Sequence, residues 1–269
     1  MKVTRPVLRY PGGKYKLAKW IISHFPQHDF YVEPYGGAGS VLMAKPRTKG
    51  EIINDLSGDV VNVFRVLREP KQAKELERLI RLTPFAYEEY KSAYDPCDEP
   101  VERARRTIFR SFTSIGSDVV SRRNSGFRGL KNNETSVTAA QEWCRYPEAI
   151  QAFVNRLQNV LIEQRPALHL LKLYDRIETL FYIDPPYLMS TRSKNSILYA
   201  YEMNEQDHIE LARALHELKG MIVLSGYPSN LYDELYADWR KIAKSATARN
   251  GKGRIECIWL SPNIKTTLF

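Results

Sequence analysis

The chain has 269 residues, 43% of them hydrophobic, which is enough for one large domain or for a catalytic domain with an insertion. Lys and Arg number 40 against 31 Asp and Glu, and the resulting charge of +9 favours polyanionic partners without establishing them. Three scattered cysteines with no CxxC or paired histidine pattern argue against a disulfide framework and a zinc site. With no signal-peptide pattern and no apolar run of membrane-spanning length, we expect a cytoplasmic protein without a membrane partner.

The first predicted elements are a strand, a glycine-rich loop and a helix. Residues 30–33 have strand character, residues 34–39 form the loop, and residues 40–44 begin a helix of small residues. A second strand over residues 51–55 ends in an acid, as the second strand of a Rossmann-like unit does. The chain therefore begins as an α/β sheet.

Residues 56–146 have a different pattern. Amphipathic helices are predicted over residues 58–68 and 71–82, and a polar segment with little strand character covers residues 111–133. This pattern predicts an inserted, mainly helical domain. It would divide the sheet domain into residues 1–55 and 147–269.

Sheet-type patterning returns after the insertion. Strands are predicted over residues 160–163, 180–183 and 221–225, and helices over residues 147–157 and 206–218 are interleaved with them. Near the end of the chain, a further strand over residues 256–260 is expected at an edge of the sheet.

The sequence Asp184-Pro185-Pro186-Tyr187 directly follows an apolar strand, so it is expected at the carboxyl edge where α/β sheets bind ligands. An exocyclic amine is a poor nucleophile and must be held by acceptors. The Asp184 carboxylate and the Pro185 carbonyl can accept its hydrogen bonds, and Tyr187 can stack on a flipped base. The alternative is a strand-terminal turn without chemistry.

The loop from Glu33 to Gly39 lets a ligand approach the backbone near a helix N-terminus. A structural tight turn would explain the same glycines. Asp55, at the end of the next strand, can accept hydrogen bonds from ribose hydroxyls or can cap the following helix. Upstream, Lys14 can pair with the carboxylate of a zwitterionic cofactor and Tyr10 can lie against its methionine part, whereas the spacing does not fit a phosphate loop.

In this order, these segments resemble the Dam-like DNA adenine-N6 methyltransferases over nearly the whole chain. Residues 9–14 are similar to the family's opening motif, residues 32–40 to its cofactor loop, residues 53–55 to its ribose-binding acid and residues 182–187 to its catalytic motif. Segments 207–218, 221–227 and 254–262 are also similar to family segments. The resemblance implies a Rossmann-like S-adenosylmethionine-dependent methyltransferase sheet, with a target-recognition domain over residues 56–146.

The resemblance also implies the ligands and the residues that hold them. S-adenosylmethionine is the expected cofactor, S-adenosylhomocysteine its product, and no metal is required. The expected catalytic residues are Asp184, Pro185 and Tyr187. The expected cofactor-binding residues are Tyr10, Lys14, Glu33, Pro34, Gly36, Gly39, Asp55 and Asp184.

Double-stranded DNA is the expected partner, and a flipped adenine is the expected target. Between residues 101 and 131, eight basic residues stand against Glu102 and Asp118. Arginine and asparagine of the 121–128 loop can read base edges and Phe127 can enter a base step, whereas a solvated basic loop would contact phosphates only. The expected DNA-contacting residues are Arg9, Arg110, Arg122, Arg123, Asn124, Phe127 and Arg128, although Arg9 is equally explained as a surface arginine.

The resemblance implies a bacterial, phage or prophage enzyme, expected as a monomer, for which a cognate restriction enzyme is a conceivable partner. The recognised DNA sequence does not follow, because residues 110–133 depart most from the family pattern. Two rival functions stay open. One is methylation of another exocyclic amine, such as cytosine N4 or an RNA adenine, and the other is a catalytically silent DNA-binding homologue.

Overall fold

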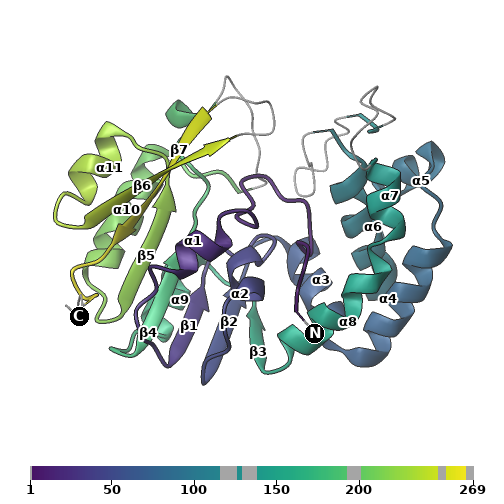
Figure 1. The fold of residues 1–269 in the computed structure, drawn as a ribbon, viewed down its shortest axis with the longest axis horizontal. Helices are drawn as coiled ribbons and strands as arrows, with labels where there is room; N and C mark the ends of the chain where they lie inside the picture. Colours follow the sequence, from purple (N-terminus) through teal and green to yellow (C-terminus); the bar gives the residue numbers. More distant parts are fainter. Residues whose placement is uncertain (1, 116–125, 129–137, 193–200, 248–252, 265–269) are drawn as a thin grey trace.

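The computed structural model describes residues 2–115, 126–128, 138–192, 201–247 and 253–264. Within these residues it contains a seven-stranded sheet of order β3-β2-β1-β4-β5-β7-β6, with β1 to β5 parallel and β7 antiparallel to both of its neighbours (Figure 1). This topology confirms the predicted Rossmann-like sheet. The strands are β1 (Phe30–Glu33), β2 (Gly50–Asn54), β3 (Val160–Glu163), β4 (Thr179–Ile183), β5 (Met221–Gly226), β6 (Arg240–Thr247) and β7 (Gly253–Leu260).

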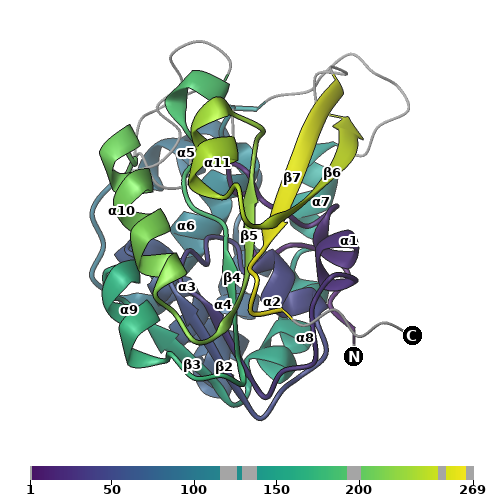
Figure 2. The ribbon, with the colours of Figure 1, turned by 90° about the vertical axis from the view of Figure 1, so that its left-hand side faces the viewer.

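Helices cover both faces of the sheet (Figures 1 and 2). The central strands have nearly continuous apolar runs because successive side chains enter opposite layers: Tyr182 packs with one cluster and Ile183 with the other. The first cluster includes residues of α1 (Ala18–Ile22) and α2 (Ser40–Ala44). The second includes residues of α9 (Ala167–Leu173), α10 (Glu205–His216) and α11 (Asn230–Leu235), and between α9 and α10 lies a 3₁₀ turn, η1 (Met189–Thr191). No helix of the described residues is long and apolar enough to cross a bilayer.

Residues 56–146 are mainly helical where the structure describes them, as predicted. Figure 1 shows most of these helices beside the sheet, past β3. Val60 and Phe64 nevertheless belong to the same core cluster as Tyr31 and Val160 of the sheet, so the insertion shares the core of the sheet. The helices are α3 (Gly58–Arg68), α4 (Pro70–Leu82), α5 (Tyr87–Ser92), α6 (Pro100–Thr113) and α7 (Ala139–Cys144), followed by α8 (Pro147–Leu157).

The prediction that residues 256–260 form an edge strand is wrong. They belong to β7, which lies between β5 and β6. The edge strand is β6, which pairs with β7 from Arg240 opposite Leu260 to Thr247 opposite Gly253. The sequence of β6 has basic residues, among them Lys241 and Lys244, and lacks the apolar pattern of a buried strand. Lysine is nevertheless common on edge strands because it opposes pairing with another chain.

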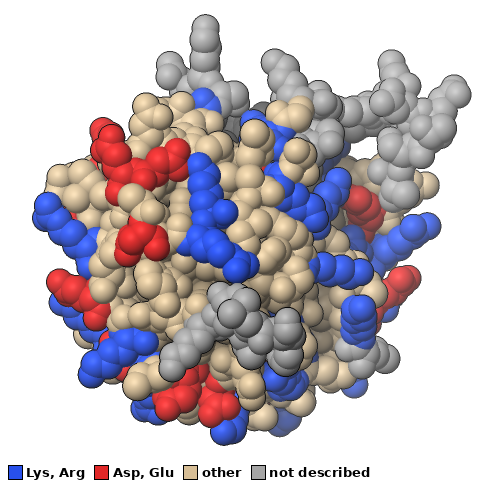
Figure 3. Space-filling model, turned by 60° about the vertical axis from the view of Figure 1, so that its left-hand side comes forward, with Lys and Arg blue, Asp and Glu red and all other residues tan. Residues whose placement is uncertain are grey.

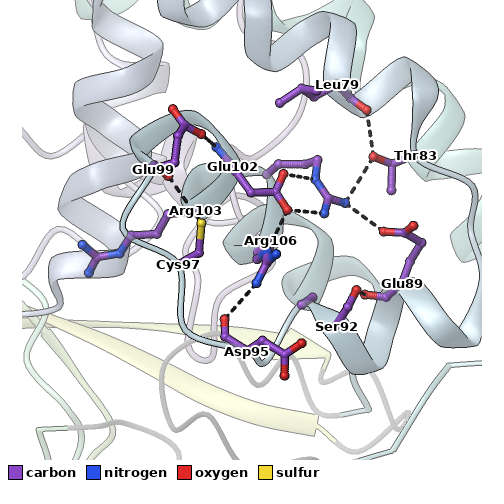
Figure 4. Close-up of polar contacts among 12 residues, drawn as sticks. Leu79, Thr83, Glu89, Ser92, Asp95, Cys97, Glu99, Glu102, Arg103 and Arg106 are labelled. Atoms are coloured by element: carbon purple, nitrogen blue, oxygen red, sulfur yellow. Dashed lines mark hydrogen bonds and ion pairs between the residues drawn. The ribbon is translucent and has the colours of Figure 1, made fainter.

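The arginines of α6 form ion pairs within the insertion, and Figure 4 shows the pair of Arg106 with Glu102. Arg105 binds Glu102 through two nitrogens, with Nη2 2.6 Å from Oε1, and its Nη1 lies 3.2 Å from Glu89 Oε2. Arg106 Nε donates to the same Glu102 at 2.7 Å. The positive charge of the α6 arginines is therefore largely balanced by carboxylates of the insertion.

The prediction that Arg110 contacts DNA is also wrong for this structure. Its side chain is only 3% exposed, Nη2 lies 3.0 Å from Asp59 Oδ2, and Nη1 donates to the Ala93 carbonyl at 2.7 Å. Asp59 also binds Arg103 Nε at 2.7 Å. Arg110 thus joins α6 to α3 and to the end of α5.

Replacing Arg110 with Ala should lower the free energy of unfolding by about 2–3 kcal/mol, because it leaves the buried Asp59 with one cation fewer. The Arg103→Ala variant is the matched control. Arg103 pairs with the same carboxylate but is about one-third exposed, so its loss should cost about 1 kcal/mol or less. Urea unfolding measures both values. Equal losses would contradict the structural role of Arg110.

Candidate functional site

A cavity of about 430 Å³ lies at the carboxyl ends of the parallel strands, within the range typical of ligand pockets. It includes the ends of β1 and β4, between which the strand order reverses, and α/β sheets bind ligands at such switch points. Its walls come from residues 10–14, 33–38, 40–41, 55–56, 166–168 and 201–203, and from Tyr182, Asp184, Pro186, Asp207, Glu210 and Leu211. Most of the predicted cofactor-binding residues therefore line one cavity.

The glycine loop is pressed against the end of β2. Gly36 N donates to Asn54 O at 2.7 Å, and a Cβ at Gly36 would lie 2.6 Å from Ile53 Cγ1. Gly39 has φ +60°, and a Cβ there would lie 2.9 Å from Ile53 Cδ1, whereas Gly37, with φ +49°, faces the Tyr10 ring. Gly36 and Gly37 thus form part of a tight turn and line the pocket, whereas Gly39 does not line it, so the two interpretations of this loop are compatible.

Asp55 joins the glycine loop to α3. Its Oδ2 accepts from Gly37 N at 2.9 Å and its Oδ1 accepts from Ser57 N at 2.8 Å. Burial raises the pKa of Asp55, and both amide hydrogen bonds act against that shift. The cap of α3 is Ser57, whose hydroxyl accepts from Val60 N, so Asp55 is not the capping residue. Asp55 lines the pocket, and its ribose-binding role stays a prediction.

Sequence reasoning missed Asn54, which holds three segments of the pocket together. Its Nδ2 donates to Pro34 O at 2.8 Å and to Arg165 O at 3.0 Å, and its Oδ1 accepts from Arg165 N at 2.8 Å. These bonds bring the residues that follow β3 next to the glycine loop. The partner segments are more than 100 positions apart along the chain, so the sequence alone gives no signal of this contact.

Glu33 lines the pocket and is 2% exposed. Its Oε2 accepts from Tyr31 OH at 3.0 Å and from Leu42 N at 3.1 Å. Burial raises the pKa of Glu33 to about 8, and the nearby Asp184 acts in the same direction. Near neutral pH the pocket therefore contains a carboxyl group that a bound cation would ionise.

Asp184 stands beside Lys14. Lys14 Nζ lies 3.0 Å from Asp184 Oδ1 and donates to Gly12 O at 2.6 Å. Burial raises the pKa of Asp184, and the Lys14 cation partly offsets this rise. Lys14 was expected to hold a cofactor carboxylate, but in the structure its amine already holds the predicted catalytic acid.

The rest of the Asp-Pro-Pro-Tyr motif is more enclosed. Pro185 is buried, and Pro186 lines the cavity. Tyr187 is 7% exposed, with Lys14 Nζ 4.6 Å from its ring centroid and its hydroxyl 3.3 Å from Glu256 Oε2. Stacking of a base on Tyr187 stays a prediction. Sequence reasoning had not singled out Glu256, which lies in the matched Arg-x-Glu segment.

Other pocket residues had no signal in the sequence or a weak one. Residues 166–168 give an apolar wall, and Asp207 with Glu210 adds carboxyl groups from α10. Arg192 binds the Tyr187 carbonyl and lies 2.8 Å from Glu202 Oε2, so it ties the catalytic turn to another wall residue. Among the described residues, no cluster of three or more His, Cys, Asp or Glu is placed to hold a metal ion.

The predicted DNA-contacting arginines that the structure describes have partners within the protein. Arg9 forms an ion pair with Glu142, and its guanidinium lies 4.8 Å from the Phe112 ring centroid. Arg128 Nη2 donates to Ser114 O at 3.2 Å. Arg122, Arg123 and Asn124 lie outside the described residues.

Phe127 has a packing role. Its ring centroid lies 5.4 Å from that of Phe85 and 5.4 Å from that of Tyr90. The Ser114–Phe127 bridge and these ring contacts attach residues 126–128 to the helices of the insertion. Phe127 would have to leave this aromatic cluster to enter a base step, and that role stays a prediction. Figure 3 shows basic side chains spread over one face of the molecule among acidic ones.

A mainly parallel sheet with an antiparallel β7, a glycine loop at its switch point and Asp-Pro-Pro-Tyr at the end of the neighbouring strand are the features of a Rossmann-like methyltransferase. Comparison with known families narrows the class: the D12 class N6 adenine-specific DNA methyltransferase family matches residues 10–250. The chain belongs to this family. The predicted family and enzyme class are thereby confirmed.

Individual relatives are similar in sequence over most of the chain. The DNA adenine methylase of Salmonella typhi is 25% identical over 254 residues, which cover 91% of this chain and 87% of that protein. The DNA adenine methylase of Escherichia coli strain K12 is 24% identical over 266 residues, which cover 93% and 92%. That of Haemophilus influenzae is 24% identical over 245 residues, covering 86% and 82%.

Proposed function

We propose that this chain transfers a methyl group from S-adenosylmethionine to the N6 amine of a flipped adenine in double-stranded DNA. The observation that carries the proposal is the position of Asp184. It follows β4 directly, lines the 430 Å³ cavity, and is held 3.0 Å from Lys14 Nζ. A carboxylate so placed can orient an amine at the mouth of a cofactor pocket.

The pocket suits S-adenosylmethionine by its charge and its shape. The cofactor carries a sulfonium and an ammonium cation, and the walls supply carboxyl groups from Glu33, Asp55, Asp207 and Glu210. The close packing of Gly36 on β2 keeps side-chain atoms out of the space next to the backbone. When bound, the cofactor supplies an activated methyl group. Tyr10, Pro34 and Gly39 complete the proposed contacts.

The catalytic work of the protein is to position an amine. The lone pair of an exocyclic amine is delocalised into the ring, and acceptors that bind its two hydrogens favour a pyramidal nitrogen. Asp184 and the Pro185 carbonyl are the proposed acceptors, and Tyr187 the proposed stacking surface. Transfer would then be a direct displacement, without a covalent enzyme intermediate. Arg9, Arg128 and the loop residues Arg122, Arg123 and Asn124 are the proposed DNA contacts.

Cofactor binding should release a proton through Glu33. The pKa of this carboxyl is raised to about 8 by burial, so near pH 7 it is mostly protonated, and an ammonium group beside it would ionise it. Affinity for the cofactor should therefore increase as the pH rises towards 8. Calorimetry at pH 7 in buffers of different ionisation enthalpy measures the released proton.

The Glu33→Gln variant is the control for this release. It keeps an acceptor for Tyr31 OH and Leu42 N but cannot ionise. The variant should release less proton than the wild type and should lose the pH dependence assigned to this group. Equal release by both proteins would assign the proton to another group and contradict the role of Glu33.

Nucleoside analysis of the product tests the proposed reaction. The purified chain is incubated with methyl-labelled S-adenosylmethionine and, in separate reactions, with duplex DNA or with RNA. We expect the label in N6-methyladenine from the duplex. Label in N4-methylcytosine or in RNA adenine would mean that the active site methylates a different amine, and it would overturn the proposed substrate.

A further inference from the structure

A second carboxylate reaches the catalytic edge of the sheet from the C-terminal hairpin. The parallel strands β4 and β5 end at this edge, whereas β7 runs in the opposite direction. The register pairs Cys257 with Gly226, the last residue of β5. Glu256, one position before Cys257, is therefore carried past the end of β5, to the side of the sheet where Asp184 lies.

The contacts of Glu256 place it in the same group as the proposed catalytic residues. Glu256 Oε2 accepts from Tyr187 OH at 3.3 Å. The Tyr187 hydroxyl also lowers the pKa of Asp184 through a hydrogen bond, and Lys14 Nζ lies 4.6 Å from the Tyr187 ring centroid. Burial raises the pKa of Glu256, which Lys14 lowers and Asp184 raises further. Tyr187 thus connects Glu256 to the Lys14–Asp184 pair.

Strand β7 also contacts Tyr187 indirectly, through Arg254 and Tyr227. Arg254 lies two positions before Glu256, and alternate residues of a strand point to the same side. Arg254 Nη1 donates to Tyr227 OH at 2.8 Å. The Tyr227 ring meets Tyr187 edge to face, with centroids 4.6 Å apart. One side of β7 therefore fixes Tyr187 both through its hydroxyl and through a neighbouring ring.

We propose that Glu256 is a positioning residue, which holds the Tyr187 hydroxyl so that the ring keeps its place beside Lys14 and Asp184. This inference rests on the proposed methyl transfer. Without Glu256 the Tyr187 hydroxyl would keep Asp184 as an acceptor but its ring would be less firmly held, and small displacements of groups around a reacting centre lower the rate strongly. Glu256 acts through Tyr187 and need not touch the substrate.

Two substitutions of Glu256 separate its hydrogen bond from its charge. Glu256→Ala removes the acceptor, and we expect kcat to fall about tenfold while cofactor affinity changes less than about twofold. Glu256→Gln keeps a carbonyl acceptor, so it should retain kcat to within about threefold of the wild type. In a Tyr187→Phe background, Glu256→Ala should cause a further loss of less than about twofold, because the shared contact is already absent.

The chain offers a matched control pair outside the site. Tyr174 OH donates to Glu163 Oε1 at the same distance, 3.3 Å, and neither residue lines the cavity. Glu163→Ala and Tyr174→Phe should leave kcat within about twofold of the wild type. Thermal unfolding of every variant shows whether a loss of turnover accompanies a loss of the folded state.

Three results would overturn the inference while the wild type still methylates adenine. They are an unchanged kcat in Glu256→Ala, a loss in Glu256→Gln as large as in Glu256→Ala, and a full additional loss in the Tyr187→Phe background. A wild-type protein that makes no N6-methyladenine would instead contradict the proposed function itself. The two failures are therefore distinguishable in one set of assays.

Discussion

Replacing Asp184 with Ala is expected to lower the rate of methyl transfer by about 10³-fold or more, because the amine loses the charged acceptor that orients it. Much of the DNA binding should be retained, since the proposed contacts of Arg9, Arg128 and the 122–124 segment are not altered. The variant also leaves Lys14, itself 5% exposed, without the carboxylate that lies 3.0 Å from its Nζ. Circular dichroism and thermal unfolding therefore accompany the rate measurement.

The Asp184→Asn variant separates charge from shape. It keeps an oxygen acceptor beside Lys14 but removes the negative charge, so some transfer should remain and the fold should be less disturbed than by Ala. Single-turnover rates with saturating DNA compare the two variants. Turnover near the wild-type rate in Asp184→Ala would remove Asp184 from the catalytic group and, with it, the main support for the mechanism.

Replacing Gly36 with Ala is expected to lower the free energy of unfolding by about 1–3 kcal/mol, which is the usual cost of overpacking a core. Because the loop would be displaced, cofactor binding should weaken at least about tenfold. A Cβ there would lie 2.6 Å from Ile53 Cγ1 and 2.8 Å from Asn54 O. The loop would have to move off β2, and Gly36 N would lose its 2.7 Å bond to Asn54 O.

Gly253→Ala is the control for this change. Gly253 lies in β7, and a Cβ at this position would meet nothing within 4 Å. The control should be neutral or slightly stabilising, because alanine restricts the unfolded chain more than glycine does. Urea unfolding and calorimetric titration with the cofactor compare the two variants. Equal behaviour of Gly36→Ala and Gly253→Ala would contradict the fit of the loop against β2.

The central sheet was predictable because its strands carry local signals. Runs such as Leu180 to Ile183 are apolar on both faces, and Asp55 and Asp184 directly follow two of the strands, so their position at one edge comes from the parallel topology. The glycine loop was predictable for the same reason, since its residues are consecutive and glycine readily adopts the positive φ found at Gly37 and Gly39.

The contacts that decide the roles of charged residues were not predictable. Arg110 looked available for DNA, but its partner Asp59 lies 51 positions earlier in another helix. Phe127 looked like the tip of a basic loop, but it completes an aromatic cluster built by α5 and residues near it. In each case a long-range contact in the folded chain outweighs the local pattern.

The hairpin of β6 and β7 could not be predicted for a different reason. Its basic edge strand lacks an apolar pattern, so the position of β7 inside the sheet, and with it the place of Glu256, could not be derived. The resemblance marked Arg254 and Glu256 only as part of a segment. The antiparallel register then places that segment beside Tyr187.

Single-molecule sequencing of DNA from a methylation-deficient host tests the central claim most directly, because it reports the modified base together with its sequence context. The host expresses either the wild-type chain or its Asp184→Ala variant, at matched levels of folded protein. We predict N6-methyladenine at one short sequence with the wild type and none with the variant. Unmodified adenine in the host that makes folded wild-type protein, or equal modification by the variant, would contradict the proposed reaction at this site.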